Sequence, residues 1–280
     1  MQDSDETAFD ATTMNITGKS CFQGEANPHN RRLSLRREAW KKPVKESTES
    51  HFVGAEPGLS PVLQTLFPVG TVAAEIRGAG RESWLFPAEA EFVRRAIPKR
   101  VREFAAGRAC ARRALEELGI RDFILRVGDD RQPIWPDSVV GSISHTADLC
   151  GAVVANKDLV AGLGIDMEVV DRVGRDLWPT ICRPEESAWH GTLPQSEREY
   201  AVALLFSAKE AFYKCQYPLT GEWLDFHDLR IEPLSWSAEE GAFAVHAERS
   251  IAAMQRGSFK GRYRFRDGVV TTGVALLRRA

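Results

Sequence analysis

The chain has 280 residues, of which 43% are hydrophobic and 27% are charged, a composition typical of globular proteins. Its formal net charge of −2 gives no overall field that would favour nucleic acid or a membrane surface, and no apolar run approaches the roughly 20 residues of a membrane span. The 5 cysteines are far apart and form no CxxC pair, which argues against zinc binding and a disulfide framework. Because the first residues also lack the pattern of a signal peptide, we expect a cytoplasmic protein.

Residues 1–55 differ in composition from the rest of the chain. They are rich in Ser, Thr, Asn, Asp and Glu and poor in aliphatic residues, so they cannot bury enough apolar surface to offset the entropy of ordering. We therefore predict a disordered N-terminal extension. Within it, the run Arg31–Lys45 (RRLSLRREAWKKPVK) is basic, with Glu38 as its one acid. This run is either a solvated tail or an arm that docks an acidic partner.

Between residues 56 and 160 the sequence predicts strands and two helices. Phe86-Pro87 opens the first helix, because proline suits the first helical turn. Pro98 begins the second helix, over Lys99–Leu118, and Gly119 ends it as a C-terminal cap. Short apolar or β-branched stretches predict strands at Thr71–Ile76, Val139–Ser144 and Cys150–Ala155.

Residues 161–280 combine helices and strands in a similar way. A helix is predicted to begin at Pro184, and Ser196-x-x-Glu199 predicts a capping box before a long helix through Lys214. The core face of that helix is predicted to comprise Leu205, Ala208, Phe212 and Cys215. Strands are predicted at Leu163–Met167, Leu229–Glu232, Ala242–His246, Gly261–Phe265 and Val269–Leu277, with turns at Glu239-Glu240-Gly241 and Asp267-Gly268.

This order of elements predicts an α+β fold of two similar halves, residues 56–160 and 161–280, although no repeat is visible in the sequence.

Two acids lie two residues apart in a predicted strand, Asp166 and Glu168. Alternate residues of a strand point to the same face, so these carboxylates project together and repel unless a cation or a proton lies between them. Hard oxygen ligands with open positions suit Mg²⁺, which takes phosphate oxygens as its remaining ligands. The alternative is a solvent-exposed strand edge, but the apolar neighbours Leu163 and Ile165 favour an interior strand.

Glu210 and Lys214 are four residues apart in the predicted long helix and so share one face. They can form an ordinary surface ion pair, which contributes about 0.3–0.5 kcal/mol. Alternatively, Glu210 is a third carboxylate near the metal or a general base, and Lys214 binds a phosphate.

Two further groups of polar residues can bind an anion. The segment Gly141–Thr146 (GSISHT) allows close backbone approach and supplies donors from Ser144 and His145, although such residues also cap turns or pack structurally. Arg100 and Arg108 lie eight residues apart on one helix, about 12 Å along its axis, a separation that can span two phosphates of one ligand. The alternative for the arginines is a solvated basic face.

Taken together in chain order, these motifs closely resemble the 4′-phosphopantetheinyl transferases. The resemblance covers residues from about 60 to 280 and includes Trp135-Pro136 between the arginines and GSISHT. Its specific parts are GIDME at Gly164–Glu168 and FSAKEAFYK at Phe206–Lys214. It points to the monomeric, two-halved branch of the siderophore-synthase and actinobacterial types, with the active site at the interface of two pseudo-symmetric halves.

The resemblance implies a holo-[acyl-carrier-protein] synthase type of reaction. The 4′-phosphopantetheine arm of coenzyme A moves to a serine of an apo acyl, peptidyl or aryl carrier protein, and adenosine 3′,5′-bisphosphate is released. Asp166 and Glu168 match the family's Mg²⁺ ligands, and Glu210 matches the third acid, as metal ligand, base or both. The implied contacts to coenzyme A come from Arg100, Arg108, Ser144, His145, Lys209 and Lys214.

The chain departs from the family pattern before Trp135. Where relatives often carry lysine, this chain has Gly128–Pro133, in which Arg131 is the one basic residue and takes the coenzyme contact in our interpretation. Three other functions stay open on the residues alone: a Mg²⁺-dependent phosphohydrolase, a module that binds coenzyme A without catalysis, and an interaction protein led by its basic N-terminal run.

Overall fold

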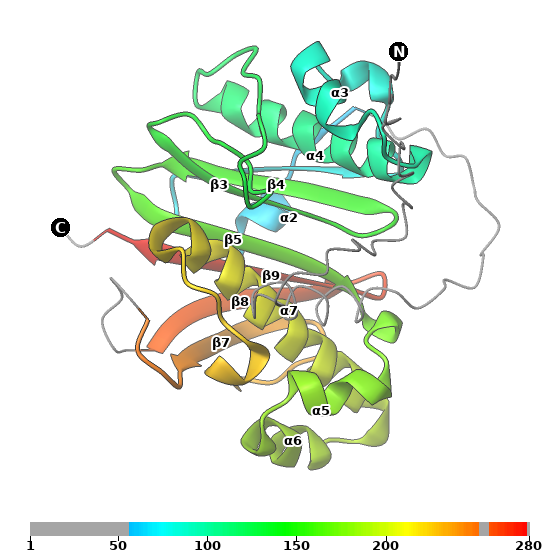
Figure 1. The fold of residues 1–280 in the computed structure, drawn as a ribbon. Coiled ribbons are helices and arrows are strands. Elements are labelled where there is room, and N and C mark those ends of the chain that lie inside the picture. The colour runs from blue at the N-terminus through cyan, green and yellow to red at the C-terminus, as the bar shows by residue number, and fades with distance from the viewer. Residues whose placement is uncertain (1–55, 252–257, 279–280) are drawn as a thin grey trace, which may run out of the picture. The chain divides into compact units, whose positions relative to one another are not determined.

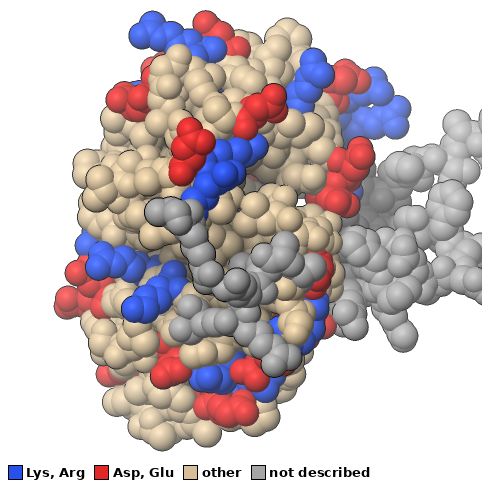
Figure 2. Space-filling model, turned by 90° about the vertical axis from the view of Figure 1, so that its left-hand side faces the viewer, with Lys and Arg blue, Asp and Glu red and all other residues tan. Residues whose placement is uncertain are grey.

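The computed structural model of the protein describes residues 56–251 and 258–278, which belong to one compact unit. The predictions for residues 1–55, including the basic run, lie outside the described residues. No described helix has both the length and the apolar composition that crossing a bilayer requires. On the face drawn in Figure 2, basic and acidic side chains alternate and do not gather into one large area of a single sign.

The first of two antiparallel sheets has the strand order β1-β2-β4-β3. The long helix α4 lies on one face of it, where its alanines and Cys110 pack against β2 and β4 (Figure 1). The elements of this region are β1 (Gly58–Leu59), α2 (Pro61–Gln64), β2 (Thr71–Arg77), the 3₁₀ turn η1 (Glu82–Trp84), α3 (Pro87–Val93), α4 (Pro98–Glu117), β3 (Val139–His145) and β4 (Leu149–Asn156).

The second sheet has the order β5-β9-β8-β7-β6 and carries the long helix α7 on one face. Its core is the largest of three buried clusters and contains the predicted apolar face of α7. The strands are β5 (Val160–Val169), β6 (Leu229–Pro233), β7 (Glu240–Ala247), β8 (Ser258–Arg266) and β9 (Val269–Leu277). The helices are η2 (Val170–Arg172), η3 (Arg175–Leu177), α5 (Trp178–Ile181), α6 (Pro184–Gly191), α7 (Gln195–Thr220) and η4 (Phe226–Asp228).

The predicted α+β class is confirmed, and every predicted strand and long helix is present within a few residues. The capping box at Ser196 was wrong, because α7 already begins at Gln195 behind Pro194, and the Glu199 carboxylate instead pairs with Arg175 at 3.1 Å. The turn predicted at Glu239-Glu240-Gly241 is placed too far along the chain. Glu240 and Gly241 already belong to β7 and pair with β8, so the connection between β6 and β7 ends before Glu240. The division into two domains at residue 160 stays a prediction.

The two sheets meet along β3 and β5, through serine side chains instead of a backbone ladder. The hydroxyl of Ser142 accepts a hydrogen bond from the backbone N–H of Ile165, and that of Ser144 from the N–H of Met167, each at 3.1 Å. Serines two apart on one strand thus satisfy N–H groups two apart on the other. A third apolar cluster, which includes Leu63 of α2, fills the space behind this joint.

Candidate active site

Helix α7 packs against β5 at very short range, which brings its polar residues to the acids of that strand. A Cβ atom added to Gly164 would lie 1.8 Å from the carbonyl oxygen of Ala211, so only glycine permits this approach. The side chain of Glu210 is almost buried, and Lys214 follows one turn later on the same helix. The GIDME motif therefore supplies both the acids and the space for the helix that faces them.

Asp166 is buried, with 2% of its surface exposed, and its two oxygens have different surroundings. Oδ1 accepts hydrogen bonds from the Lys214 ammonium at 2.7 Å and from the Ser144 hydroxyl at 3.2 Å. Among the described residues, Oδ2 has no hydrogen-bond partner although it is also buried. A buried carboxylate oxygen without a partner is costly, and a bound cation would satisfy it.

Glu168 projects from the same side of β5 as Asp166, as predicted from the strand period. Burial, followed by the charge of Asp166, raises its pKa to about 7. Its Oε1 accepts the N–H of Val169 at 2.9 Å. The charge of Asp166 opposes the ionisation of Glu168, and a divalent cation between them would remove that conflict.

These acids fit Mg²⁺ in number and type. No group of three or more His, Cys, Asp or Glu in the described part of the chain is arranged to hold a metal by itself. Mg²⁺ does not need such a cage, because it commonly binds one or two carboxylates and completes its shell with water and substrate phosphates. The unpartnered Oδ2 of Asp166 and the raised pKa of Glu168 are what such a site requires.

Lys214 is the cation at the centre of the site. Its Nζ donates to Asp166 Oδ1 at 2.7 Å, and to the Ser144 hydroxyl and the Ile165 carbonyl at 3.2 Å each. The side chain remains 30% exposed, so a ligand can reach the ammonium. Lys214 thus lies beside the predicted metal ligands, and its contact with a phosphate stays a prediction.

His145 and Arg100 extend the site from the end of β3 to the beginning of α4. An Arg100 N–H lies 3.0 Å from His145 Nε2. Because arginine can only donate, Nε2 accepts and the imidazole is neutral, in keeping with a pKa that burial lowers below the usual histidine range. Arg100 is half exposed and also contacts Glu103 at 3.4 Å. This pair offers one accessible guanidinium to an anion.

Three residues expected to contact the coenzyme lie outside this group. Arg108 is buried, with its guanidinium 3.9 Å over the Phe104 ring and its Nε donating to the Leu125 carbonyl at 3.1 Å, and burial lowers its pKa to about 10. Lys209 is fully buried against Glu186. Arg131 is exposed, at φ 65° in a loop. Arg108 and Lys209 are thus packed against protein groups in this structure, and the coenzyme contacts expected of all three residues stay predictions.

The partner of Lys209 was missed by the sequence reasoning. Glu186 accepts from Lys209 Nζ at 2.6 Å, from the Arg183 N–H at 2.8 Å and from the Ile231 N–H at 2.7 Å, and Lys209 also donates to the Ile181 carbonyl at 2.8 Å. This buried network ties α6, α7 and β6 together. One signal was available: Lys209 and Lys214 are five residues apart, so they face directions about 140° apart around the helix.

Comparison with known proteins agrees with this constellation. The model of the 4′-phosphopantetheinyl transferase N-terminal domain matches residues 88–155, and that of the 4′-phosphopantetheinyl transferase superfamily matches residues 162–270. The chain is similar to three named relatives. It is 33% identical to the 4′-phosphopantetheinyl transferase Npt of Nocardia iowensis, over 76% of this chain and 99% of the relative.

The second is the 4′-phosphopantetheinyl transferase Svp of Streptomyces mobaraensis, at 38% identity over 69% of this chain and 79% of the relative. The third is the 4′-phosphopantetheinyl transferase PptT of Mycobacterium tuberculosis, at 34% identity over 68% of this chain and 85% of the relative. Both halves of the chain are thus matched, in the order that the motifs predict. The chain belongs to the 4′-phosphopantetheinyl transferase superfamily, as a member of its two-halved type.

Proposed function

We propose that this transferase moves the 4′-phosphopantetheine arm of coenzyme A to a serine of an apo carrier protein at the site formed by β5 and α7. The observation that carries the proposal is the state of Asp166. This buried carboxylate has one oxygen on Lys214 and the other without a partner among the described residues, beside a second acid with a raised pKa. Family membership indicates the reaction, and this pair of acids supports assigning the reaction to this site.

In the proposed reaction, the serine oxygen of the carrier bonds to the phosphorus that bears the pantetheine arm. The bond from that phosphorus to the bridging oxygen breaks, and adenosine 3′,5′-bisphosphate leaves with the bonding electrons. The serine proton passes to a base. Glu210 is the candidate, because it is an almost buried acid on the helix face next to Lys214. Glu210 alternatively serves as a third metal ligand.

Asp166 and Glu168 would hold Mg²⁺, which supplies charge stabilisation to the pyrophosphate when bound. Lys214 contributes a fixed positive charge at the same place, because its ammonium is already positioned by Ser144 and the Ile165 carbonyl. Arg100, oriented by the neutral His145, binds a second phosphate of the coenzyme. Arg131 is exposed on its loop and adds a further cation.

The loop that carries Arg131 is hydrogen-bonded to helix α7. The Tyr217 hydroxyl near the end of α7 donates to Asp130 at 2.9 Å. The loop and the helix can thus hold the coenzyme from two sides. We further propose that the enzyme works as a cytoplasmic monomer on acyl, peptidyl or aryl carriers.

Incubation with coenzyme A, Mg²⁺ and a panel of apo carriers, followed by intact mass measurement, tests the proposal. We expect one carrier to gain a single phosphopantetheine group and the gain to stop when EDTA removes the metal. Asp166→Ala should lose transfer while its circular dichroism stays that of the wild type, because Lys214 is exposed enough to remain hydrated. Hydrolysis of coenzyme A without a carrier, or Mg²⁺-dependent transfer by Asp166→Ala, would contradict the assignment.

A further inference from the structure

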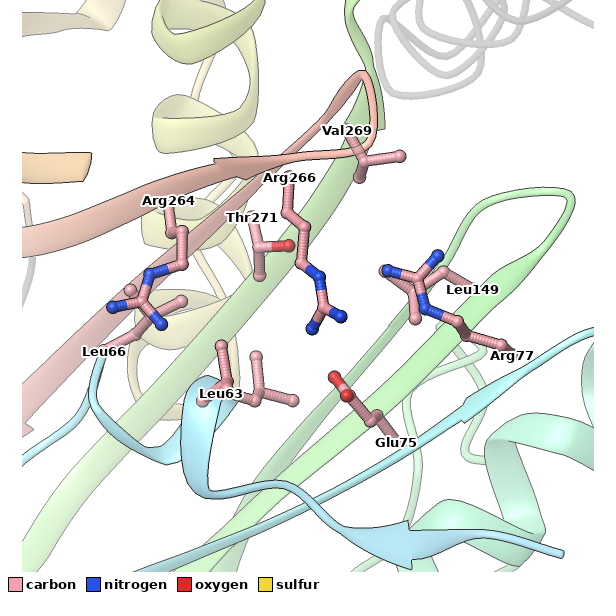
Figure 3. A pocket seen from close by; sticks show the side chains of 10 residues that line it. Leu63, Leu66, Glu75, Arg77, Leu149, Arg264, Arg266, Val269 and Thr271 are labelled. Carbon is pink, nitrogen blue, oxygen red and sulfur yellow. The ribbon is translucent and has the colours of Figure 1, made fainter. Parts of the chain in front are cut away.

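A pocket lies on the face of the sheets that is opposite to Asp166. Adjacent residues of β9 point in opposite directions: Thr272 bonds to Ser207 of α7 on the catalytic side, whereas Thr271 lines this pocket. Figure 3 shows side chains from α2, β2, β8 and β9 around it.

The bottom of the pocket is apolar. Leu63, Leu66 and Leu149 belong to the cluster packed between the sheets, and each exposes less than a tenth of its surface. The open space of about 400 Å³ includes solvent at its mouth, so the hollow itself is shallow and takes at most one side chain, not an extended cofactor. Val62 lines the pocket and is 37% exposed, so the apolar surface reaches the outside.

Arginines surround this apolar surface. On β8, Arg262, Arg264 and Arg266 occupy alternate positions and so point to the same face, and Arg77 reaches the pocket from β2. Figure 3 shows the guanidinium groups of Arg77, Arg264 and Arg266 gathered around the opening. We call Arg77, Arg262, Arg264 and Arg266 the arginine column.

The acids near the arginine column satisfy only part of its charge. Asp267 serves two arginines, Arg77 at 2.7 Å and Arg266 at 3.5 Å. Glu240 pairs with Arg264, and Glu75 lies inside the pocket below Arg266 (Figure 3). The pairs made by Asp267 are exposed and therefore weak, so an incoming carboxylate can replace them.

We propose that this pocket docks an extended acidic segment of a partner protein. One apolar side chain enters the pocket, and carboxylates two residues before and after it bind the arginine column. In an extended chain these two carboxylates are about 13 Å apart, which is the separation of Arg262 and Arg266 along β8. Arginine also recognises carboxylates through two parallel hydrogen bonds and is enriched in protein interfaces. The docking is independent of the proposed transfer, because it uses the opposite face.

A labelled peptide with the sequence Asp-Ser-Leu-Ser-Asp is the probe, with binding followed by fluorescence anisotropy. We expect it to bind the full-length protein, and to bind at least about tenfold more tightly than Lys-Ser-Leu-Ser-Lys or Asp-Ser-Ser-Ser-Asp. The double variant Arg264→Glu/Arg266→Glu should lose at least about tenfold in peptide affinity, while transfer from coenzyme A to a carrier stays at the wild-type rate.

Arg94→Glu is the matched control, since Arg94 is also an exposed arginine paired with a glutamate, 2.8 Å from Glu91, but lies at the end of α3. It should bind the peptide like the wild type. A fall in peptide binding that Arg94→Glu shares would reveal a general charge effect and overturn the proposal, as would equal binding of all three peptides. Peptide binding by an inactive transferase would leave the docking intact and refute only the proposed function.

Discussion

Gly164 offers the sharpest test of how the fold builds the active site. In Gly164→Ala the new methyl would lie 1.8 Å from the Ala211 carbonyl oxygen and 2.8 Å from the Cys215 nitrogen, both backbone atoms of α7. Because real Cβ atoms essentially never approach closer than 3.0 Å, α7 and β5 have to separate by about the difference, 3.0 less 1.8 Å, or roughly 1.2 Å.

This separation carries two expected costs. Overpacking of this kind destabilises a fold by about 1–3 kcal/mol. Glu210 and Lys214 move with α7, and a misplacement of about 1 Å can reduce a rate by about 100-fold. We therefore expect Gly164→Ala to lose about 1–3 kcal/mol in urea unfolding and about 100-fold in kcat/KM for carrier modification, measured at a temperature where the variant is folded.

Gly191→Ala provides the control. Gly191 lies in α6 with no atom within 4 Å of an added Cβ, so the change should be neutral or stabilising by up to about 1 kcal/mol, with normal activity. Wild-type stability and rate in Gly164→Ala would refute the close approach of α7. A destabilised variant with a normal rate would refute the link between that approach and catalysis.

Two further predictions concern the buried charges. Lys209→Met should cost about 3–5 kcal/mol in urea unfolding, because it leaves Glu186 buried without its cation, yet coenzyme A should bind with unchanged affinity in calorimetry. A tenfold loss of coenzyme affinity with unchanged stability would instead show that Lys209 contacts coenzyme A. Glu168 has a raised pKa, so its stabilising contribution is present below pH 4.5 and is lost as the pH rises to about 7. Urea unfolding from about pH 4.5 to about pH 8 without metal should show this decline, which Glu168→Gln should remove and Mg²⁺ should reduce; identical profiles for wild type and variant would contradict it.

The sequence was sufficient for the local order of the molecule. The small and β-branched stretch at β3 and the apolar stretches at β4 and β5 were predicted correctly, and so were the proline and glycine at the two ends of α4, because these features depend on neighbours in the chain. The side-chain alternation of β5 was also predictable, since the two-residue spacing of Asp166 and Glu168 is enough to place both on one side of a strand.

Other features depended on contacts between distant segments. The GSISHT segment is predicted to bind an anion, and the structure shows in addition that Ser142 and Ser144 join β3 to β5. Nothing in the segment itself shows this, since the N–H groups it satisfies belong to another sheet. The arginine column likewise surrounds a pocket only because α2 and β2 lie opposite β8.

The two lysines of FSAKEAFYK show the same division most clearly. The sequence determined that both lie on one helix and, at five residues apart, on different faces of it. Only the tertiary structure decided that Lys214 faces a buried carboxylate oxygen of β5 while Lys209 faces Glu186 in the core. Helix periodicity is a property of the local backbone, whereas the partner of a buried charge depends on which distant segment packs against that face.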